Sequence, residues 1–177
     1  MTIIWFLLGG LALLIVTVIV IGLRMPERYE GRSEVVYART TEEVWGALLD
    51  HDKHPMTGKM NRSVLAQPEE NGLPVWIEDM GHGELITVRT TEMDRPKHLV
   101  REMTSKAMPM TSRWKYTLES AGEGCRLTID GETSIRSGSL KVPIFRVMMV
   151  LGGGVKKGLD IQMDMVADTL GVEARRE

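Results

Sequence analysis

The chain begins with a long apolar segment. No charged residue occurs between Ile3 and Leu23, where the sequence reads IIWFLLGGLALLIVTVIVIGL. As a helix this segment rises roughly 31 Å, which matches the hydrocarbon thickness of a bilayer. A cleaved signal peptide is the alternative, but the segment lacks a basic start and an A-x-A site and is too long for one. We therefore predict one transmembrane helix that is retained as an anchor.

Basic residues next to this segment predict its orientation. Arg24, Arg28 and Arg32 follow the apolar run, whereas only Met1 and Thr2 precede it. Because flanking Lys and Arg residues stay on the cytoplasmic side, we expect a single-pass protein of the cell membrane with its domain in the cytoplasm. The predicted parts of the chain are an anchor (1–24), a linker (25–28), a domain (29–171) and a tail (172–177).

Alternating apolar and polar residues after the anchor predict β-strands. Thr40 and Glu43 form a capping box that predicts a short helix after the first strand. Turn signals such as Asn71-Gly72 and Gly122 to Gly124 separate the later strands, as in an antiparallel meander. The predicted strands cover residues 29–37, 63–66, 75–79, 85–91, 99–104, 111–119 and 125–135.

The C-terminal part of the domain has a helical period. Between residues 140 and 170, apolar positions recur at steps of three and four, which predicts one apolar stripe on a long amphipathic helix. Gly152, Gly153 and Gly154 interrupt it, so we expect a bend or a break into two helices there. The stripe contains Phe145, Met148, Met149, Gly152, Val155, Leu159, Met163, Val166 and Leu170.

Together these elements predict an α+β helix-grip domain. A curved antiparallel sheet of about seven strands packs on the long C-terminal helix, and one transmembrane helix precedes it. The sheet has one face to bury and only this helix to bury it against. If the sheet curls around the helix, the two enclose a space, and the pattern leaves open whether side chains fill it.

Four strings in this order resemble the SRPBCC superfamily, which includes START domains, birch-pollen-allergen-like proteins and polyketide cyclases. They are ARTTEEVWGALLDHDKHP, TEMDRPKHLV, SRWKYTLESAGEGCRLTI and VPIFRVMM. The chain departs from the resemblance at Met56 and Thr57, where many relatives carry a tryptophan. The resemblance implies a cavity between sheet and C-terminal helix that binds an apolar or amphipathic small molecule, such as a lipid, an isoprenoid or a polyketide-like compound.

Aromatic residues with one polar atom are the best candidates for such a site. Trp76, Trp114 and Tyr116 each combine a large apolar body with a single polar handle. Core packing without a ligand is the alternative explanation for them. Further lining residues, chosen by alternation and stripe position, are Met80, Met103, Val155, Leu159 and Met163.

We expect binding or transfer of a hydrophobic molecule rather than catalysis, and we assign no catalytic residue. A cyclase or dehydratase is the alternative, and it needs an ionisable side chain that faces the pocket; Glu78, Arg101 and His98 are the candidates. A regulatory module that binds another protein is a third possibility.

The composition and the lack of certain motifs argue against several other functions. The 22 Lys and Arg residues against 24 Asp and Glu residues, without a basic run, argue against nucleic acid as a partner. Cys125 is the only cysteine, so an intrachain disulfide cannot form. His51, Asp52 and His54 fit a solvated loop better than a metal site, because no HExxH is present. We expect neither a metal nor a cofactor.

Overall fold

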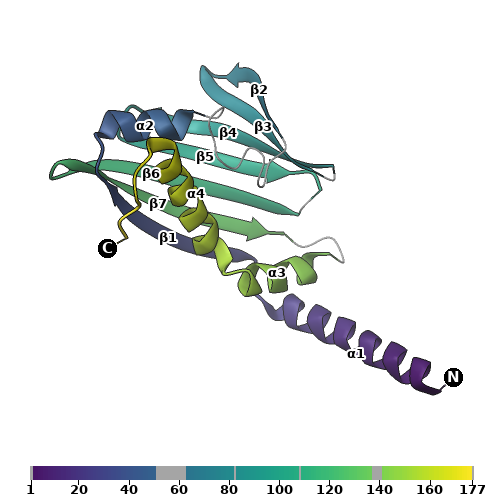
Figure 1. Cartoon of the computed structure of the whole chain (residues 1–177). Helices are drawn as coiled ribbons and strands as arrows, with labels where there is room; N and C mark the ends of the chain where they lie inside the picture. Colours follow the sequence, from purple (N-terminus) through teal and green to yellow (C-terminus); the bar gives the residue numbers. More distant parts are fainter. Residues whose placement is uncertain (1, 51–62, 82, 108, 137–140, 177) are drawn as a thin grey trace.

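A seven-stranded antiparallel sheet wraps around one long helix in the computed structural model, as Figure 1 shows. The structure describes residues 2–50, 63–81, 83–107, 109–136 and 141–176. The strands follow the order β1-β7-β6-β5-β4-β3-β2. They are β1 (Arg28–Tyr37), β2 (Ser63–Glu70), β3 (Leu73–Gly81), β4 (Glu84–Asp94), β5 (His98–Ser105), β6 (Met110–Ala121) and β7 (Gly124–Ile135). The helices are α1 (Thr2–Arg24), α2 (Thr41–Leu49), α3 (Val142–Leu151) and α4 (Gly154–Leu170).

This architecture confirms the predicted α+β helix-grip fold. All seven expected strands are present, and β2 is longer than predicted, continuing through Gln67 and Pro68 to Glu70. The polar sequence QPEE hides this extension, because an edge strand needs no apolar pattern and tolerates proline. The predicted loop that contains His51, Asp52, His54, Met56 and Thr57 lies outside the described residues.

The core lies between α4 and the inner face of the sheet, which we define as the face that α4 covers. Leu159 and Met163 of α4 pack with Tyr37 of β1 and with Leu127 and Ile129 of β7, all fully buried. The Tyr37 hydroxyl donates to the Met163 carbonyl over 2.8 Å, which also satisfies the polar end of this side chain. The stripe on α4 is therefore the centre of the apolar core.

Two glycines allow α4 to lie close to the sheet. Gly31 and Gly131 face each other on β1 and β7. A Cβ atom at Gly31 would come within 2.8 Å of the Lys156 backbone nitrogen. At Gly131 it would come within 2.9 Å of the side chains of Leu159 and Val155. The helix backbone thus rests where both strands lack a side chain.

The capping box predicted at the start of α2 is present. The Glu43 backbone N–H donates to the Thr40 hydroxyl, and the Thr40 backbone N–H donates to the Glu43 carboxylate. These bonds satisfy backbone donors that the first helical turn leaves unpaired. Val44, Trp45 and Leu48 then bury the inner side of α2 in the core.

The C-terminal segment breaks at the three glycines, as the sequence indicates. Gly153 and Gly154 have φ angles of 93° and 67°, in the left-handed region that glycine adopts without strain. The break separates α3 from α4 and ends the continuous stripe. Met148, which the stripe predicts to be packed, is 60% exposed instead.

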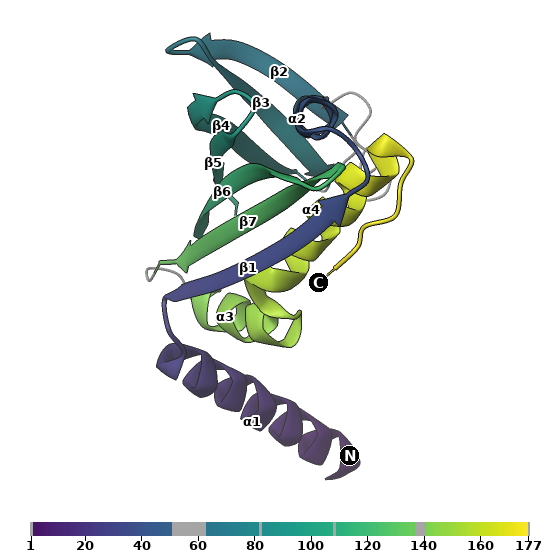
Figure 2. The ribbon, with the colours of Figure 1, turned by 90° about the vertical axis from the view of Figure 1, so that its left-hand side faces the viewer.

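α3 leaves the sheet and contacts the C-terminal end of α1, as Figures 1 and 2 show. The buried Arg146 guanidinium joins these parts. It donates to the Met25 carbonyl over 3.2 Å and to the Ile135 carbonyl over 3.1 Å, and it pairs with Glu27 over 3.0 Å. α3 is therefore tied both to the end of α1 and to the end of β7.

Within the described residues, α1 is the one helix long and apolar enough to cross a bilayer. Leu7, Leu13 and Leu14 are among its exposed side chains, and none of its apolar window is buried inside the molecule. The helix is thus not a core element of the domain.

A glycine-to-alanine pair tests the close approach of α4. We expect Gly31→Ala to lower the free energy of unfolding by about 1–3 kcal/mol, because its methyl group meets the backbone of α4. Gly46→Ala on α2 is the control, since nothing lies within 4 Å of its added methyl group. The control should be neutral or stabilise by up to about 1 kcal/mol. Denaturant unfolding of the full chain in detergent measures both, and equal midpoints would contradict the packing described.

Candidate ligand-binding site

A buried arginine lies at the centre of the inner face. Arg101 of β5 is only 3% exposed. Its guanidinium carbon lies 4.8 Å from the centre of the Trp76 ring and 5.2 Å from that of Tyr116. Both distances are within the range of cation–π attraction. Two of the three aromatic residues predicted from sequence as ligand contacts therefore flank a positive charge.

The guanidinium also caps the C-terminal end of α2. One Nη2–H donates to the Leu48 carbonyl over 2.7 Å. This carbonyl is among those that a helix leaves unpaired at its C-terminus, where the helix dipole favours a cation. Among the described residues, no carboxylate forms an ion pair with Arg101. Within the described part of the chain, the groups that stabilise this positive charge are the Leu48 carbonyl and two aromatic rings.

Unsatisfied polar atoms form a row beside this charge. Thr90, Arg101 and Trp114 face each other across β4, β5 and β6. The Thr90 hydroxyl, the Arg101 Nε and the Trp114 Nε1 are buried and have no hydrogen-bond partner among the described residues. Folded proteins rarely leave such groups unpaired, because each costs about 1–3 kcal/mol. This polar row can donate to or accept from a bound molecule.

Tyr116 and Glu78 add polar groups to the same face. Burial raises the pKa of the Tyr116 phenol, and the nearby Arg101 charge partly offsets that shift. The phenol is therefore neutral at physiological pH, a form that can both donate and accept a hydrogen bond. The Trp76 Nε1 donates to the half-buried Glu78 carboxylate over 3.0 Å.

The remaining predicted lining residues belong to β3, β5 and α4, and Met80 lies at the register shift between Asp79 and Gly81. Met80 of β3 and Met103 of β5 are half-buried, and Val88 joins Met103 to Trp76 across the sheet. Val155, Leu159 and Met163 of α4 are buried in the core cluster. Packing against β1 and β7 accounts for the burial of these three, so their contact with a ligand stays a prediction.

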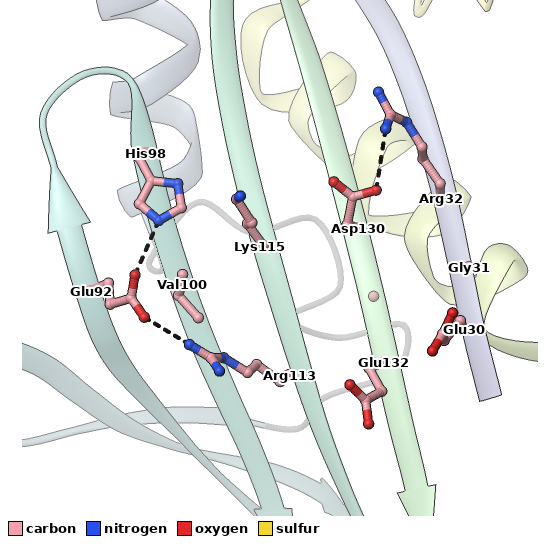
Figure 3. Close-up of a pocket in the computed structure, with 11 residues that line it drawn as sticks. Glu30, Gly31, Arg32, Glu92, His98, Val100, Arg113, Lys115, Asp130 and Glu132 are labelled. Carbon is pink, nitrogen blue, oxygen red and sulfur yellow. Dashed lines mark hydrogen bonds and ion pairs between the residues drawn. The ribbon is translucent and has the colours of Figure 1, made fainter. Parts of the chain in front are cut away.

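His98 is placed on the opposite, outer face of the sheet, so it does not belong to the inner-face site. Its Nε2 lies 3.3 Å from the Glu92 carboxylate, which also pairs with Arg113 over 2.7 Å. Figure 3 shows these side chains in a groove of about 670 Å³ on that face. Charged residues of both signs line it, including Arg32 paired with Asp130. Such a surface does not suit an apolar ligand.

A second hollow of about 470 Å³ lies beside the start of α2, between Thr40, Pro96 and Glu119. Neither it nor the outer groove contains any of the eight predicted contact residues. The inner-face site around Arg101 is thus distinct from both surface hollows.

Sequence reasoning missed Thr90 as a member of the polar row. The alternation of strand residues puts Thr90 on the same face of β4 as Val88. Its position beside Arg101, however, follows only from the register between β4 and β5. Arg101 was a candidate only for catalysis, since an arginine within an alternating strand more often faces solvent.

Comparison with known proteins shows which family has this fold. Residues 30–171, from β1 to the end of α4, match the family described as polyketide cyclase / dehydrase and lipid transport. The chain belongs to this family. Family membership confirms the resemblance seen in the sequence, and α1 lies outside the matched region. No curated protein sequence matches the chain.

Several solved structures share the fold of this polyketide cyclase / dehydrase and lipid transport family member at low sequence identity. The Zhui aromatase/cyclase from Streptomyces sp. R1128 is 16% identical, with a TM-score of 0.64 over 81% of this chain and 94% of that one. Norcoclaurine synthase from Thalictrum flavum is 8% identical, with a TM-score of 0.58 over 87% and 92%. Ara h 8.0201 is 12% identical, with a TM-score of 0.59 over 81% and 99%. At these identities the likeness shows the fold alone.

Replacing the buried arginine tests whether it is required for folding. Arg101→Met loses the bond to Leu48, which costs about 1.5–3 kcal/mol, but it also removes the cost of burying a charge. We therefore expect a change in unfolding free energy below about 2 kcal/mol. Arg113→Met on the exposed outer face is the control and should change it by less than about 1 kcal/mol. Loss of more than about 4 kcal/mol in Arg101→Met would mark Arg101 as a structural residue.

Proposed function

We propose that this protein is a membrane-anchored module that binds or transfers a mostly apolar small molecule, which carries a carbonyl or anionic oxygen. A lipid, an isoprenoid or a polyketide-like compound has this chemistry. The ligand lies between the inner face and α4, and its oxygen meets Arg101. The observation that carries this proposal is the buried guanidinium, which contacts two aromatic rings and adjoins two further unpaired polar groups.

The physical argument is one of complementarity. A buried cation gains most from an oxygen ligand, because a charge-assisted hydrogen bond in a dry site is stronger than one in water. The rings of Trp76 and Tyr116 give the apolar part of the ligand a surface next to that oxygen. Residues Met80, Met103, Trp114, Val155, Leu159 and Met163 complete the proposed contacts.

Anchoring by α1 suits an insoluble ligand. Such a molecule is concentrated in the bilayer, so a binding face held at the membrane surface shortens its path through water. The three arginines that follow the apolar segment favour a domain on the cytoplasmic side of a cell membrane.

Co-purification tests ligand binding. The full chain, Arg101→Met and Arg113→Met are purified in detergent, extracted with organic solvent and compared by mass spectrometry. We expect the same bound compound in wild type and in Arg113→Met, and roughly tenfold less in Arg101→Met, because a charge-assisted bond contributes about 1.5–3 kcal/mol. A wild-type protein without any bound compound, or equal amounts in all three, would contradict the proposal.

Protease protection tests the orientation. In intact expression-host cells, a protease added outside should leave the domain uncut, and permeabilised cells should lose it. Cleavage in intact cells would place the domain on the outer side and reverse the proposed topology.

A second candidate function is chemistry of the cyclase or dehydratase type. It is favoured by the Glu78 carboxylate, which lies on the same face as Arg101 and Tyr116. Glu78→Gln removes the basic oxygen and keeps the shape of the side chain. If the compound recovered from this variant is heavier by one water than the wild-type compound, the protein is a dehydratase. An equal mass with a different chromatographic retention time indicates cyclisation without loss of water, and an identical mass and retention time favour binding alone.

A further inference from the structure

Exposed apolar side chains are concentrated on α3. Apart from α1, the described part of the chain exposes six large hydrophobic side chains, and four of them lie on this ten-residue helix. They are Ile144 (41% exposed), Met148 (60%), Val150 (50%) and Leu151 (81%). Arg146, the one charged residue of α3, is buried. The outer surface of α3 is therefore apolar without a charge, which is unusual for a surface that faces water.

α3 also lies beside the end of the membrane helix. Gly22 is buried, and a Cβ atom there would come within 2.1 Å of the Pro143 carbonyl oxygen. Val18 and Ile19 are half-buried on the same side of α1 as Gly22, and Met25, directly after the helix, is also half-buried. Arg24 marks the end of the apolar run, and Val18 lies roughly 9 Å deeper along the helix axis. The contact between the two helices thus extends below the polar end of the span.

The position of α3 is held by polar contacts rather than by a loose linker. Arg146 bonds to the carbonyls of Met25 and Ile135 and pairs with Glu27. The Ile135 backbone N–H in turn donates to the Glu27 carbonyl over 2.8 Å. These bonds turn the buried side of α3 toward the linker and β7, with Pro143 against α1, and leave Ile144, Met148 and Leu151 exposed.

We propose that α3 is an interfacial helix that inserts its exposed apolar side chains into the bilayer crossed by α1. The occupant of this surface is lipid, because the surface is continuous with the membrane-spanning helix. The domain then has two membrane contacts and a fixed orientation on the surface. This inference rests on the proposed anchoring by α1, and it is independent of the ligand.

Depth-dependent quenching tests the inference on the full chain. In a Cys125→Ala background, single cysteines are introduced by Met148→Cys, Leu151→Cys, Leu14→Cys or Asp168→Cys and labelled with an environment-sensitive fluorophore. The proteins are reconstituted in vesicles of phosphatidylcholine and phosphatidylglycerol that contain nitroxide lipids. Leu14 reports on α1, and Asp168 is an exposed control on the far part of α4.

We expect shallow nitroxides to quench the labels at Met148 and Leu151 at least about threefold more than the label at Asp168, because interfacial helices sink roughly 5–10 Å into the headgroup boundary. Quenching at Leu14 with no excess at Met148 and Leu151 overturns the inference and leaves the anchor intact. No quenching at Leu14 contradicts the anchor itself. Labels on α3 that become exposed to an aqueous quencher when protein is diluted in lipid would show contact with a second copy, which also overturns it.

Discussion

The contact between α4 and two facing glycines determines how the rest of the molecule is arranged. Gly31 and Gly131 are direct cross-strand partners, so the sheet has a smooth strip across β1 and β7 where a helix backbone can rest. The helix therefore lies toward one side of the inner face. The row that begins at Gly131 continues through Trp114 and Arg101 to Thr90, away from the contact with α4. The inner face thus has an apolar part, where α4 packs on β1 and β7, and a polar end at Arg101 and Thr90 of β5 and β4.

Burying a cation at that polar end is costly, and the described surroundings of Arg101 show how the fold tolerates it. Two aromatic faces and the carbonyl of Leu48 at the end of α2 supply partial negative charge, and no carboxylate of the described residues forms an ion pair with the guanidinium. A carboxylate in the same place would neutralise the guanidinium and leave little to attract a ligand. The arrangement instead keeps the positive charge in place with hydrogen-bonding capacity to spare at Nε.

Most of the fold was predictable because it follows from local pattern. The alternation of β6 and β7, the capping box of α2 and the glycine break each depend on residues close together in sequence. The placement of the site was harder to predict. Along β5 the set Leu99, Arg101 and Met103 alternates with His98, Val100 and Glu102, and each set mixes apolar and ionisable residues. Only the pairing with β6 decides which set faces inward, so Arg101 and His98 could not be told apart from sequence alone.

The exposure of α3 was also beyond the sequence pattern. A continuous apolar stripe implies a continuous buried face, but the positive φ angles at Gly153 and Gly154 redirect the chain and end that relation. The consequence concerns how the two helices can change over evolutionary time. Substitutions in α4 must fit a crowded protein interior, whereas α3 and α1 share a separate packing contact around Gly22 and Pro143. The three glycines thus place neighbouring helices under different constraints, because α4 must fit the core of the sheet whereas α3 must fit the end of α1 and the end of β7.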